Sequence, residues 1–429
     1  MGLSRARAAA LSVLDATLSG RATLDRAFER AAAREDLTGP DRGFARLLVA
    51  VTLRRLGEID AVIAPFLRRP LPKKALTASN ILRLGAAQLL FLNTPAHAAV
   101  GETTGLARGQ AASYKGLANA VLRRIAEGGP ALADPSKAAR RNTPGWLWES
   151  WAKAYGADVA GRIADAHMVE PPLDLTVRDG ADARWAAALG GEALPTGGVR
   201  LVATGRPTDL AGYGDGAWWP QDAAAALPAR LFGPVAGKSI VDLCAAPGGK
   251  SAQLAAAGAR VTAVDIAEPR MRRLAENMRR LKLDVTAVVA DSLEWRPDMP
   301  ADGVLLDAPC SATGTIRRHP DVAWSKSTAA VRALLPIQSE LLDAAAEMLK
   351  PGGVLVYACC SLQPAEGPEQ IARFLERKAD FARKPIGPDE VSGLPEDALT
   401  SDGDLRTLPC HWAERGGMDG FYVARLIRA

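Results

Sequence analysis

The first third of the chain carries the hydrophobic pattern of α-helices. Apolar residues recur there at spacings of three and four residues, which gathers them on one face of a helix. Prolines fall mainly between these segments or near their ends, where a helix is readily interrupted. The pattern predicts an all-α bundle over residues 1–130. Its helices are expected at residues 8–18, 45–56, 59–67, 80–92 and 116–125.

This pattern breaks after the bundle. Residues 127–135 read EGGPALADP, a stretch rich in glycine and proline that predicts a linker. From residue 170 onward, short alternating runs separated by turn residues favour strands over helices. We therefore expect a linker and a small mixed α/β segment over residues 131–215.

From residue 240, short apolar runs alternate with longer segments of helical spacing. Such alternation is typical of a doubly wound α/β domain built on a parallel sheet, and we expect this domain over residues 216–429. The expected strands are residues 240–243, 260–264, 284–289, 303–306, 354–358 and 420–428. The expected helices are residues 250–257, 269–281, 328–349 and 368–378.

The end of the first of these strands has the features of a ligand site. Residues 239–250 read SIVDLCAAPGGK, which predicts a strand, a tight glycine turn and the start of a helix. Gly248 and Gly249 let a ligand approach the backbone, and the helix start offers unpaired N–H groups. Asp265 ends the next strand, where a carboxylate can accept hydrogen bonds from both hydroxyls of a ribose. These features together indicate a ligand that contains a nucleoside.

Composition narrows the class of protein. Of 429 residues, 48% are hydrophobic and 24% are charged, which is ordinary for a soluble globular protein. Asp15 interrupts the apolar N-terminal stretch, so it does not read as a signal peptide, and no apolar run approaches the ~18 residues of a membrane span. The five cysteines are too few for a disulfide framework and lack the paired spacing of zinc ligands. We expect a cytoplasmic protein without a metal.

Positive charge is concentrated in the first part of the chain. Residues 1–140 hold 21 Lys and Arg against 11 Asp and Glu, whereas the remaining residues hold 32 against 37. This asymmetry suggests a polyanion as partner, although a solvated basic surface explains it equally well. Candidate phosphate contacts are the basic pairs Arg54-Arg55, Arg68-Arg69, Lys73-Lys74 and Arg123-Arg124.

Five motifs of the second half occur together in one protein family. They are VDLCAAPGGK at 241–250, VDI at 264–266, Asp291 after a strand, LDAPCSATGTIRRHPD at 306–321 and YACCSLQPAE at 357–366. In combination they resemble the RNA cytosine-5 methyltransferases, and the chain is most similar to the bacterial members that act on small-subunit ribosomal RNA. The resemblance covers nearly the whole chain, because those enzymes carry a helical N-terminal domain similar to the antitermination factor NusB.

The resemblance implies a Rossmann-like catalytic domain with S-adenosyl-L-methionine as methyl donor. It implies that Asp265 binds the ribose hydroxyls, that Asp291 binds the adenine amino group, and that Asp307 lies beside both the donor and the target base. The role of Lys250 stays open between orienting Asp307 and binding the donor carboxylate. The other expected lining residues of the donor site are Cys244, Ala245, Ala246, Pro247, Gly248, Gly249 and Lys250.

Two cysteines are expected to carry the chemistry. Carbon 5 of cytosine is a poor nucleophile, and a thiolate that adds to carbon 6 turns the ring into a reactive enamine. By the family pattern Cys360 is the attacking nucleophile, Cys310 assists loss of the carbon-5 proton and release of the enzyme, and Cys359 is a bystander. Asp307 stabilises charge on the base. An alternative stays open, because Pro309-Cys310 also resembles the nucleophile motif of DNA cytosine methyltransferases.

RNA is the expected partner. Arg317, Arg318 and His319 follow the base site and are expected to hold flanking phosphates. The target base must leave its stack, so we expect a loop or unfolded segment of small-subunit ribosomal RNA as substrate, with no DNA, no membrane and a monomeric enzyme. The chain departs from the family at residues 366–369, where EGPE replaces a glutamate–asparagine–glutamate run, and Glu366 is therefore left without a role.

Three other functions stay open at this point. A transfer RNA cytosine-5 methyltransferase would use the same site, and a non-catalytic RNA-binding or antitermination-type factor would need only the N-terminal bundle. A nicotinamide-dependent dehydrogenase would also begin with a glycine turn. However, AAPGGK lacks the GxGxxG spacing of dinucleotide sites, and no set of hydride-transfer residues follows it.

Overall fold

A computed structural model describes residues 2–202 and 205–429, with side chains from Arg5 onward. The chain divides into two compact units and passes from one to the other three times, after Met168, Arg317 and Ser327. The first unit comprises the chain up to Met168 together with Arg318–Ser327. The second comprises Val169–Arg317 and Thr328–Ala429. Among the described residues, no helix is both long and apolar enough to cross a lipid bilayer.

The first unit is helical, as the periodicity predicts. Its bundle buries one apolar core, to which every long helix contributes leucine, isoleucine, valine or alanine side chains. The periodicity did not predict two short helices, α2 and α6, although the buried positions on α2 do follow the helical spacing. The bundle helices are α1 (Gly2–Leu18), α2 (Leu24–Arg34), α3 (Gly39–Arg54), α4 (Leu56–Ile63), α5 (Leu76–Phe91), α6 (Ala96–Thr104) and α7 (Lys115–Gly128).

This unit is larger than the domain expected over residues 1–130. The stretch predicted to be a linker holds the end of α7 and a short 3-10 helix, Gly129–Leu132. Three further helices then pack on the bundle or on one another: α8 (Pro135–Arg141), α9 (Gly145–Tyr155) and α10 (Ala157–His167). The side chain of Asn142 connects these additional helices to the bundle, because its oxygen accepts the backbone N–H of the buried Glu58 at 3.0 Å.

A segment from late in the sequence completes the first unit. Residues 318–327 contain the short helix α15 (Val322–Ser325). The carboxylate of Asp321 accepts the backbone N–H of Leu24 at 3.1 Å, at the start of α2, where Thr23 provides no side-chain cap. The indole N–H of Trp324 donates to the carbonyl oxygen of Leu53 at 2.8 Å. Asp321 thus satisfies one of the unpaired N–H groups at a helix start, from almost three hundred residues away.

The second unit begins with a small antiparallel sheet of order β2-β3-β1-β4. Its strands are β1 (Leu173–Val177), β2 (Glu192–Ala193), β3 (Val199–Leu201) and β4 (Trp218–Pro220), with the helix α11 (Asp182–Leu189) between β1 and β2. The fully buried Trp218 anchors its core. Strand β4 lies beyond residue 215, so this sheet extends past the bounds expected for the small mixed segment.

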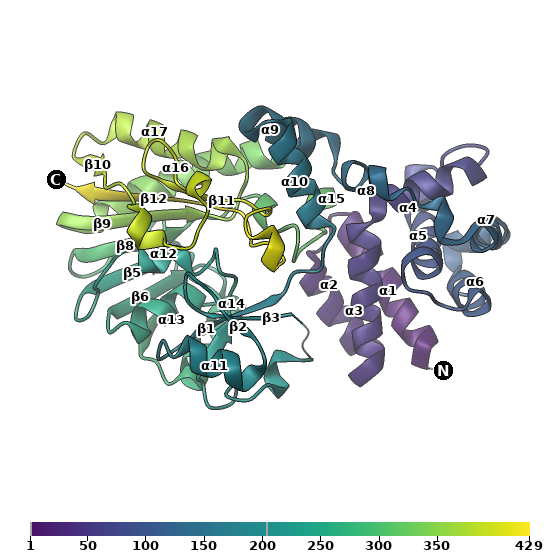
Figure 1. Cartoon of the computed structure of the whole chain (residues 1–429), viewed down its shortest axis with the longest axis horizontal. Coiled ribbons are helices and arrows are strands. Elements are labelled where there is room, and N and C mark those ends of the chain that lie inside the picture. Colours follow the sequence, from purple (N-terminus) through teal and green to yellow (C-terminus); the bar gives the residue numbers. More distant parts are fainter. Residues whose placement is uncertain (1, 203–204) are drawn as a thin grey trace. The chain divides into compact units, whose positions relative to one another are not determined.

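The large sheet of the second unit has the order β10-β12-β9-β8-β5-β6-β7, and Figure 1 shows its labelled strands from β10 to β6 stacked side by side. Five of the six expected strands pair in parallel with one another: β5 (Ser239–Leu243), β6 (Arg260–Asp265), β7 (Val285–Val289), β8 (Ala301–Asp307) and β9 (Leu349–Cys359). The last strand, β12 (Phe421–Arg428), is antiparallel to β9. The short strands β10 (Phe381–Arg383) and β11 (Leu405–Thr407) pair with β12.

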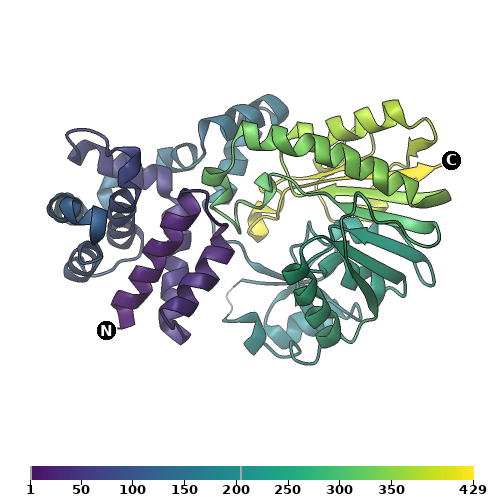
Figure 2. The ribbon, with the colours of Figure 1, turned by 180° about the vertical axis from the view of Figure 1, so that it is seen from behind.

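Helices cover both faces of this sheet, which confirms the doubly wound fold. Side chains alternate along β5, so Ile240 packs with α12 (Leu227–Arg230) and α13 (Gly249–Ala256) on one face. Val241 packs on the other face with α16 (Thr328–Glu347) and α17 (Pro368–Arg377), and Figure 2 shows α16, in green, running along the sheet. The helix α14 (Glu268–Leu281) packs with α13 beside β6. The carboxyl ends of the parallel strands are left to the loops that carry the predicted site residues.

Candidate active site

The turn after β5 has the backbone that its sequence predicts. Cys244 and Gly248 both adopt positive φ angles, +58° and +99°. A Cβ on Gly248 would lie 2.8 Å from Cγ of Leu274, so both the angle and the space at this position require glycine. Burial raises the pKa of Cys244 to about 12, which keeps this thiol protonated at neutral pH.

Two of the predicted donor-binding acids lie at neighbouring strand ends. Asp265 ends β6 and is nearly buried, and its carboxylate accepts the backbone N–H of Ala246 at 3.2 Å and that of Ala267 at 2.9 Å. Asp291 follows β7 and is half-buried, with Oδ1 accepting the backbone N–H of Leu293 at 2.9 Å. Each carboxylate is therefore held in place by backbone groups and keeps further lone pairs for a ligand.

Lys250 and Asp307 form an ion pair at the ends of β5 and β8. The ammonium nitrogen of Lys250 lies 2.6 Å from Oδ2 of Asp307, and their side chains are 10% and 31% exposed. Burial alone would lower the pKa of Lys250, but the Asp307 carboxylate outweighs it and raises that pKa overall. Of the two roles that the sequence left open for Lys250, this geometry supports the orientation of Asp307.

The two predicted catalytic cysteines meet in the structure. Asp307 of β8 pairs in register with Ala358 of β9, so the loops that follow these strands start side by side. Cys310 and Cys360 lie in those loops with their sulfur atoms 3.3 Å apart, and both side chains are half-buried. The hydrogen-bonded Cys310 thiol and burial raise the pKa of Cys360 well above its ordinary value, so Cys360 carries its proton at neutral pH. Cys359 is fully buried and donates to the carbonyl oxygen of Glu366 at 3.2 Å.

Glu366 joins the two cysteine loops, a function that sequence reasoning missed. Its fully buried carboxylate accepts the backbone N–H of Ser311 at 2.8 Å, together with the Ser311 hydroxyl. It also accepts the Ser361 hydroxyl at 2.5 Å and the side-chain amide of Gln338 at 3.1 Å. Ser311 follows Cys310 and Ser361 follows Cys360. One carboxylate therefore fixes the backbone next to both thiols.

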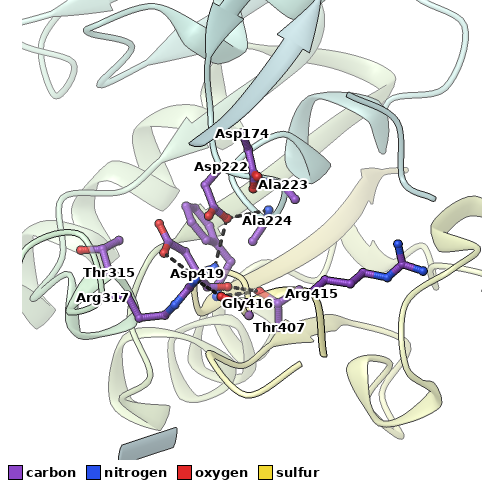
Figure 3. A network of polar contacts seen from close by, with 12 residues as sticks. Asp174, Asp222, Ala223, Ala224, Thr315, Arg317, Thr407, Arg415, Gly416 and Asp419 are labelled. Carbon is purple, nitrogen blue, oxygen red and sulfur yellow. Dashed lines mark hydrogen bonds and ion pairs between the residues drawn. The ribbon is translucent and has the colours of Figure 1, made fainter. Parts of the chain in front are cut away.

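Arg317 does not lie where a phosphate contact should, which corrects the prediction made for it. Its side chain is fully buried, and Figure 3 shows it directed at the loop that contains Gly416 and Asp419. The guanidinium donates to the carbonyl oxygen of Gly416 and lies 3.7 Å from Oδ1 of Asp419. The backbone N–H of Asp419 in turn donates to Asp222 at 3.1 Å. Arg317 thus ties the loop after Cys310 to the chain just before β12.

The other two predicted RNA contacts belong to the first unit. Arg318 and His319 are both half-buried. The ring nitrogen Nδ1 of His319 lies 3.6 Å from Oδ2 of Asp25. Neither position excludes a phosphate contact, and both residues stay predictions.

The chemistry of this sheet edge fits S-adenosylmethionine. The donor carries two ribose hydroxyls, an adenine amino group and a cationic sulfonium, all of which seek acceptors or negative charge. Asp265, Asp291 and Asp307 present three carboxylates at the carboxyl ends of β6, β7 and β8, parallel strands that flank β5 in one sheet, where ligands of such sheets bind. No group of three His, Cys, Asp or Glu side chains in the described part of the chain is placed to hold a metal ion.

Comparison with known proteins agrees with this geometry. The model of the family "16S rRNA methyltransferase RsmB/F" matches residues 229–427, and that of the NusB family matches residues 4–127. The ribosomal RNA small subunit methyltransferase B of Serratia proteamaculans is 36% identical over 414 residues, which are 92% of each chain. The protein of the same name from Pseudomonas putida is 36% identical over 98% of each chain.

A solved structure shares the whole fold. The crystal structure of PH0851 superimposes with a TM-score of 0.78 at 22% identity, over 98% of this chain and 99% of that one. The NusB match ends close to residue 130, so the additional helices α8–α10 of the first unit lie outside it. Taken together, the paired cysteines, the strand-end acids and the near full-length similarity show that the chain belongs to the RsmB/F family of 16S rRNA methyltransferases, with a NusB-type N-terminal domain.

Proposed function

We propose that this protein transfers a methyl group from S-adenosylmethionine to carbon 5 of a cytosine in 16S ribosomal RNA, through a covalent bond between Cys360 and carbon 6. The observation that carries the proposal is the pair of thiols 3.3 Å apart beside the Lys250–Asp307 ion pair. A reaction with one covalent step and one proton removal needs two such groups at one base.

The donor would be held by the edge formed by β5, β6, β7 and β8. Asp265 would accept the ribose hydroxyls, Asp291 the adenine amino group, and the turn of Gly248 and Gly249 would admit the methionine portion. Cys244, Ala245, Ala246, Pro247 and Lys250 complete the proposed lining. When bound, S-adenosylmethionine supplies an electrophilic methyl group on its sulfonium.

The chain's own residues would then carry the base through four bond changes. Asp307, a carboxylate in its ion pair with Lys250, takes the proton of Cys360 and passes it to N3 of the base, while the Cys360 sulfur bonds to carbon 6 and the enamine forms. The ammonium of Lys250 interacts electrostatically with Cys360 and favours the thiolate. Carbon 5 takes the methyl group, and the carbon-5 proton leaves to the Cys310 sulfur, which acts in its deprotonated form. N3 returns its proton to Asp307, and the bond between Cys360 and carbon 6 breaks with its electron pair returning to the Cys360 sulfur.

The RNA class is inferred from the relatives. Proteins that match this chain over more than nine-tenths of its length are named for small-subunit ribosomal RNA, and this supports 16S RNA over transfer RNA. Arg318 and His319 are proposed to contact phosphates that flank the target. The extruded base implies a single-stranded or loop substrate.

Three cysteine variants test the chemistry. Cys310→Ala should accumulate a denaturation-resistant adduct between enzyme and RNA, because the carbon-5 proton is no longer removed. Cys360→Ala should form no adduct and transfer no methyl group. Cys359→Ala is the matched control, since that thiol is fully buried, and it should behave as the native enzyme. An adduct that forms in Cys360→Ala and not in Cys310→Ala would reverse the assignment of the nucleophile.

The substrate needs a separate test. Bisulfite sequencing of 16S ribosomal RNA from a strain that lacks the gene should show one or more cytosines that have lost protection. Protection lost in transfer RNA alone would contradict the proposed RNA class while leaving the cysteine chemistry intact.

A further inference from the structure

The first unit contains a hollow of about 860 Å³ whose wall combines rings with cations. It lies between the connection that leads from α4 to α5 and the beginning of α7. Phe66 and Tyr114 provide half-buried aromatic rings. Four exposed basic side chains line it as well, and we call this site the basic hollow: Arg68, Arg69, Lys74 and Arg124.

The charge of the basic hollow is uncompensated. No Asp or Glu is among its lining residues, and none of its four cations makes an ion pair with any described residue of the chain. A second hollow of the same unit, of about 750 Å³, differs because Asp15 and Glu35 line it and Glu35 pairs with Arg34 at 3.0 Å. Clustered like charges repel one another, so a wall of this kind is most stable with an anion against it.

The basic hollow also gathers motifs that lie far apart in the sequence. Three of the four basic pairs noted along the N-terminal third contribute to it, at 68–69, 73–74 and 123–124. The fourth pair is used within the fold, because Arg55 lies over the ring of Phe91 and pairs with Glu58 at 3.0 Å. In the folded chain, therefore, one of the four basic pairs stabilises the helical bundle, and the other three converge on a single surface.

We propose that the basic hollow binds a single-stranded segment of RNA, with its four cations on phosphates and with Phe66 and Tyr114 stacked against bases. Sites for single-stranded nucleic acid combine positive charge along the backbone with aromatic platforms for the bases. A duplex offers its phosphates but hides its bases, so it would engage the cations without the rings. The inference rests on the proposed RNA substrate and adds a second contact surface to it.

The test measures RNA binding by the full-length chain without any methyl donor. The probe is a fluorescein-labelled RNA too short to fold, compared with its duplex, and the readout is anisotropy across a salt series. Arg69→Glu and Arg124→Glu should each weaken binding about 10-fold and reduce the slope of log Kd against log salt by about 0.7 per lost contact. The matched control is Arg26→Glu, an exposed arginine of α2 outside the hollow, which should change Kd less than about 2-fold.

Variants of Tyr114 isolate the stacking contribution. Tyr114→Leu keeps an apolar side chain without a ring, and it should weaken single-stranded binding about 5-fold or more while duplex binding is unchanged. Tyr114→Phe keeps the ring and should bind as the native protein does. Thermal unfolding of each variant shows whether the helical unit is intact.

Three outcomes would overturn the inference. Equal weakening by Arg69→Glu and Arg26→Glu would mean that RNA responds to general surface charge. If Arg69→Glu leaves RNA binding unchanged but abolishes the binding of a polyglutamate peptide, the occupant of the basic hollow is an acidic protein segment. Equal loss of single-stranded and duplex binding in Tyr114→Leu would remove the stacking role. Methyl transfer measured in parallel separates the two proposals. If the native protein transfers the methyl group but the variants of the basic hollow bind RNA normally, only the present inference is refuted. If the native protein transfers no methyl group but the variants bind RNA more weakly, only the proposed function is refuted.

Discussion

The variant Glu366→Gln tests whether one buried carboxylate holds the two cysteine loops in place. Oε1 of Glu366 accepts the Ser311 backbone N–H and the Gln338 amide, and Oε2 accepts the hydroxyls of Ser311 and Ser361. Glutamine keeps the shape of the side chain but replaces one of these oxygens by an NH₂ group. Since hydroxyls can turn and the backbone N–H cannot, the new NH₂ should face the two serines.

The magnitude follows from the bonds that change. Each hydrogen bond to a charged group contributes about 1.5–3 kcal/mol, and all four would become weaker contacts with a neutral amide. Removal of a buried charge recovers part of its desolvation cost, so we expect a net loss of about 2 kcal/mol in the free energy of unfolding. Glu366→Ala leaves all four donors without their acceptor, at about 1–3 kcal/mol for each buried donor, so its loss should exceed about 4 kcal/mol.

Urea unfolding and steady-state kinetics measure the two consequences. Glu369→Gln is the control, because Glu369 starts the neighbouring helix and pairs only with the exposed Arg373 at 2.8 Å. Such surface pairs contribute less than about 1 kcal/mol. For Glu366→Gln, kcat should fall because the thiols move relative to each other, whereas KM for S-adenosylmethionine should stay constant because no donor-site acid touches Glu366. Stability and kcat equal to those of Glu369→Gln would refute the reasoning.

Three further variants test other contacts. Burial raises the pKa of Asp242 from 3.8 to about 7, so the native state keeps a proton that the unfolded chain releases in that window. The free energy of unfolding should therefore fall as pH rises through it, by on the order of 4 kcal/mol in the limit, and urea unfolding should show a flatter dependence for Asp242→Asn. Arg317→Met removes the cation that lies 3.7 Å from the buried Asp419 carboxylate and should cost about 3–5 kcal/mol of stability, whereas a mere phosphate contact would affect RNA affinity and leave thermal unfolding unchanged. Gly248→Ala should destabilise the protein by more than about 1 kcal/mol beyond Gly233→Ala, because both glycines have positive φ but only at Gly248 would a Cβ meet Leu274; equal melting temperatures would contradict this.

Hydrophobic periodicity was sufficient to predict most of the fold. The five parallel strands are short apolar runs bounded by turns, so their positions follow from local sequence. The additional helices α8–α10 were missed because glycine and proline in residues 127–135 resemble a linker, although those residues form turns of helix. The inclusion of residues 318–327 in the first unit depends on contacts with α2 and α3, which no local pattern reveals.

The residues of the candidate site also divide into those that the sequence could predict and those that it could not. Asp307 ends β8, Cys310 follows it in the next loop, and Cys360 directly follows β9. Parallel strands bring such positions together, so their proximity could be expected from spacing. Arg317 and Glu366 could not be assigned in this way, because their partners are set by tertiary packing. Arg317 is buried by a loop about a hundred residues later, and Glu366 is surrounded by donors from two other segments. An acid seven residues after the end of β9 was the only signal for Glu366.

The membership of residues 318–327 in the helical unit has a practical consequence for anyone who wishes to dissect this protein. Neither half of the molecule is encoded by one uninterrupted piece of the gene. A polypeptide that stops at Met168 would lack both the carboxylate that caps α2 and the indole that reaches Leu53, and a protease cut after Met168 would leave the halves covalently joined by two other peptide segments. Separate study of the helical half therefore requires a transplanted copy of Arg318–Ser327, joined to or supplied alongside the fragment.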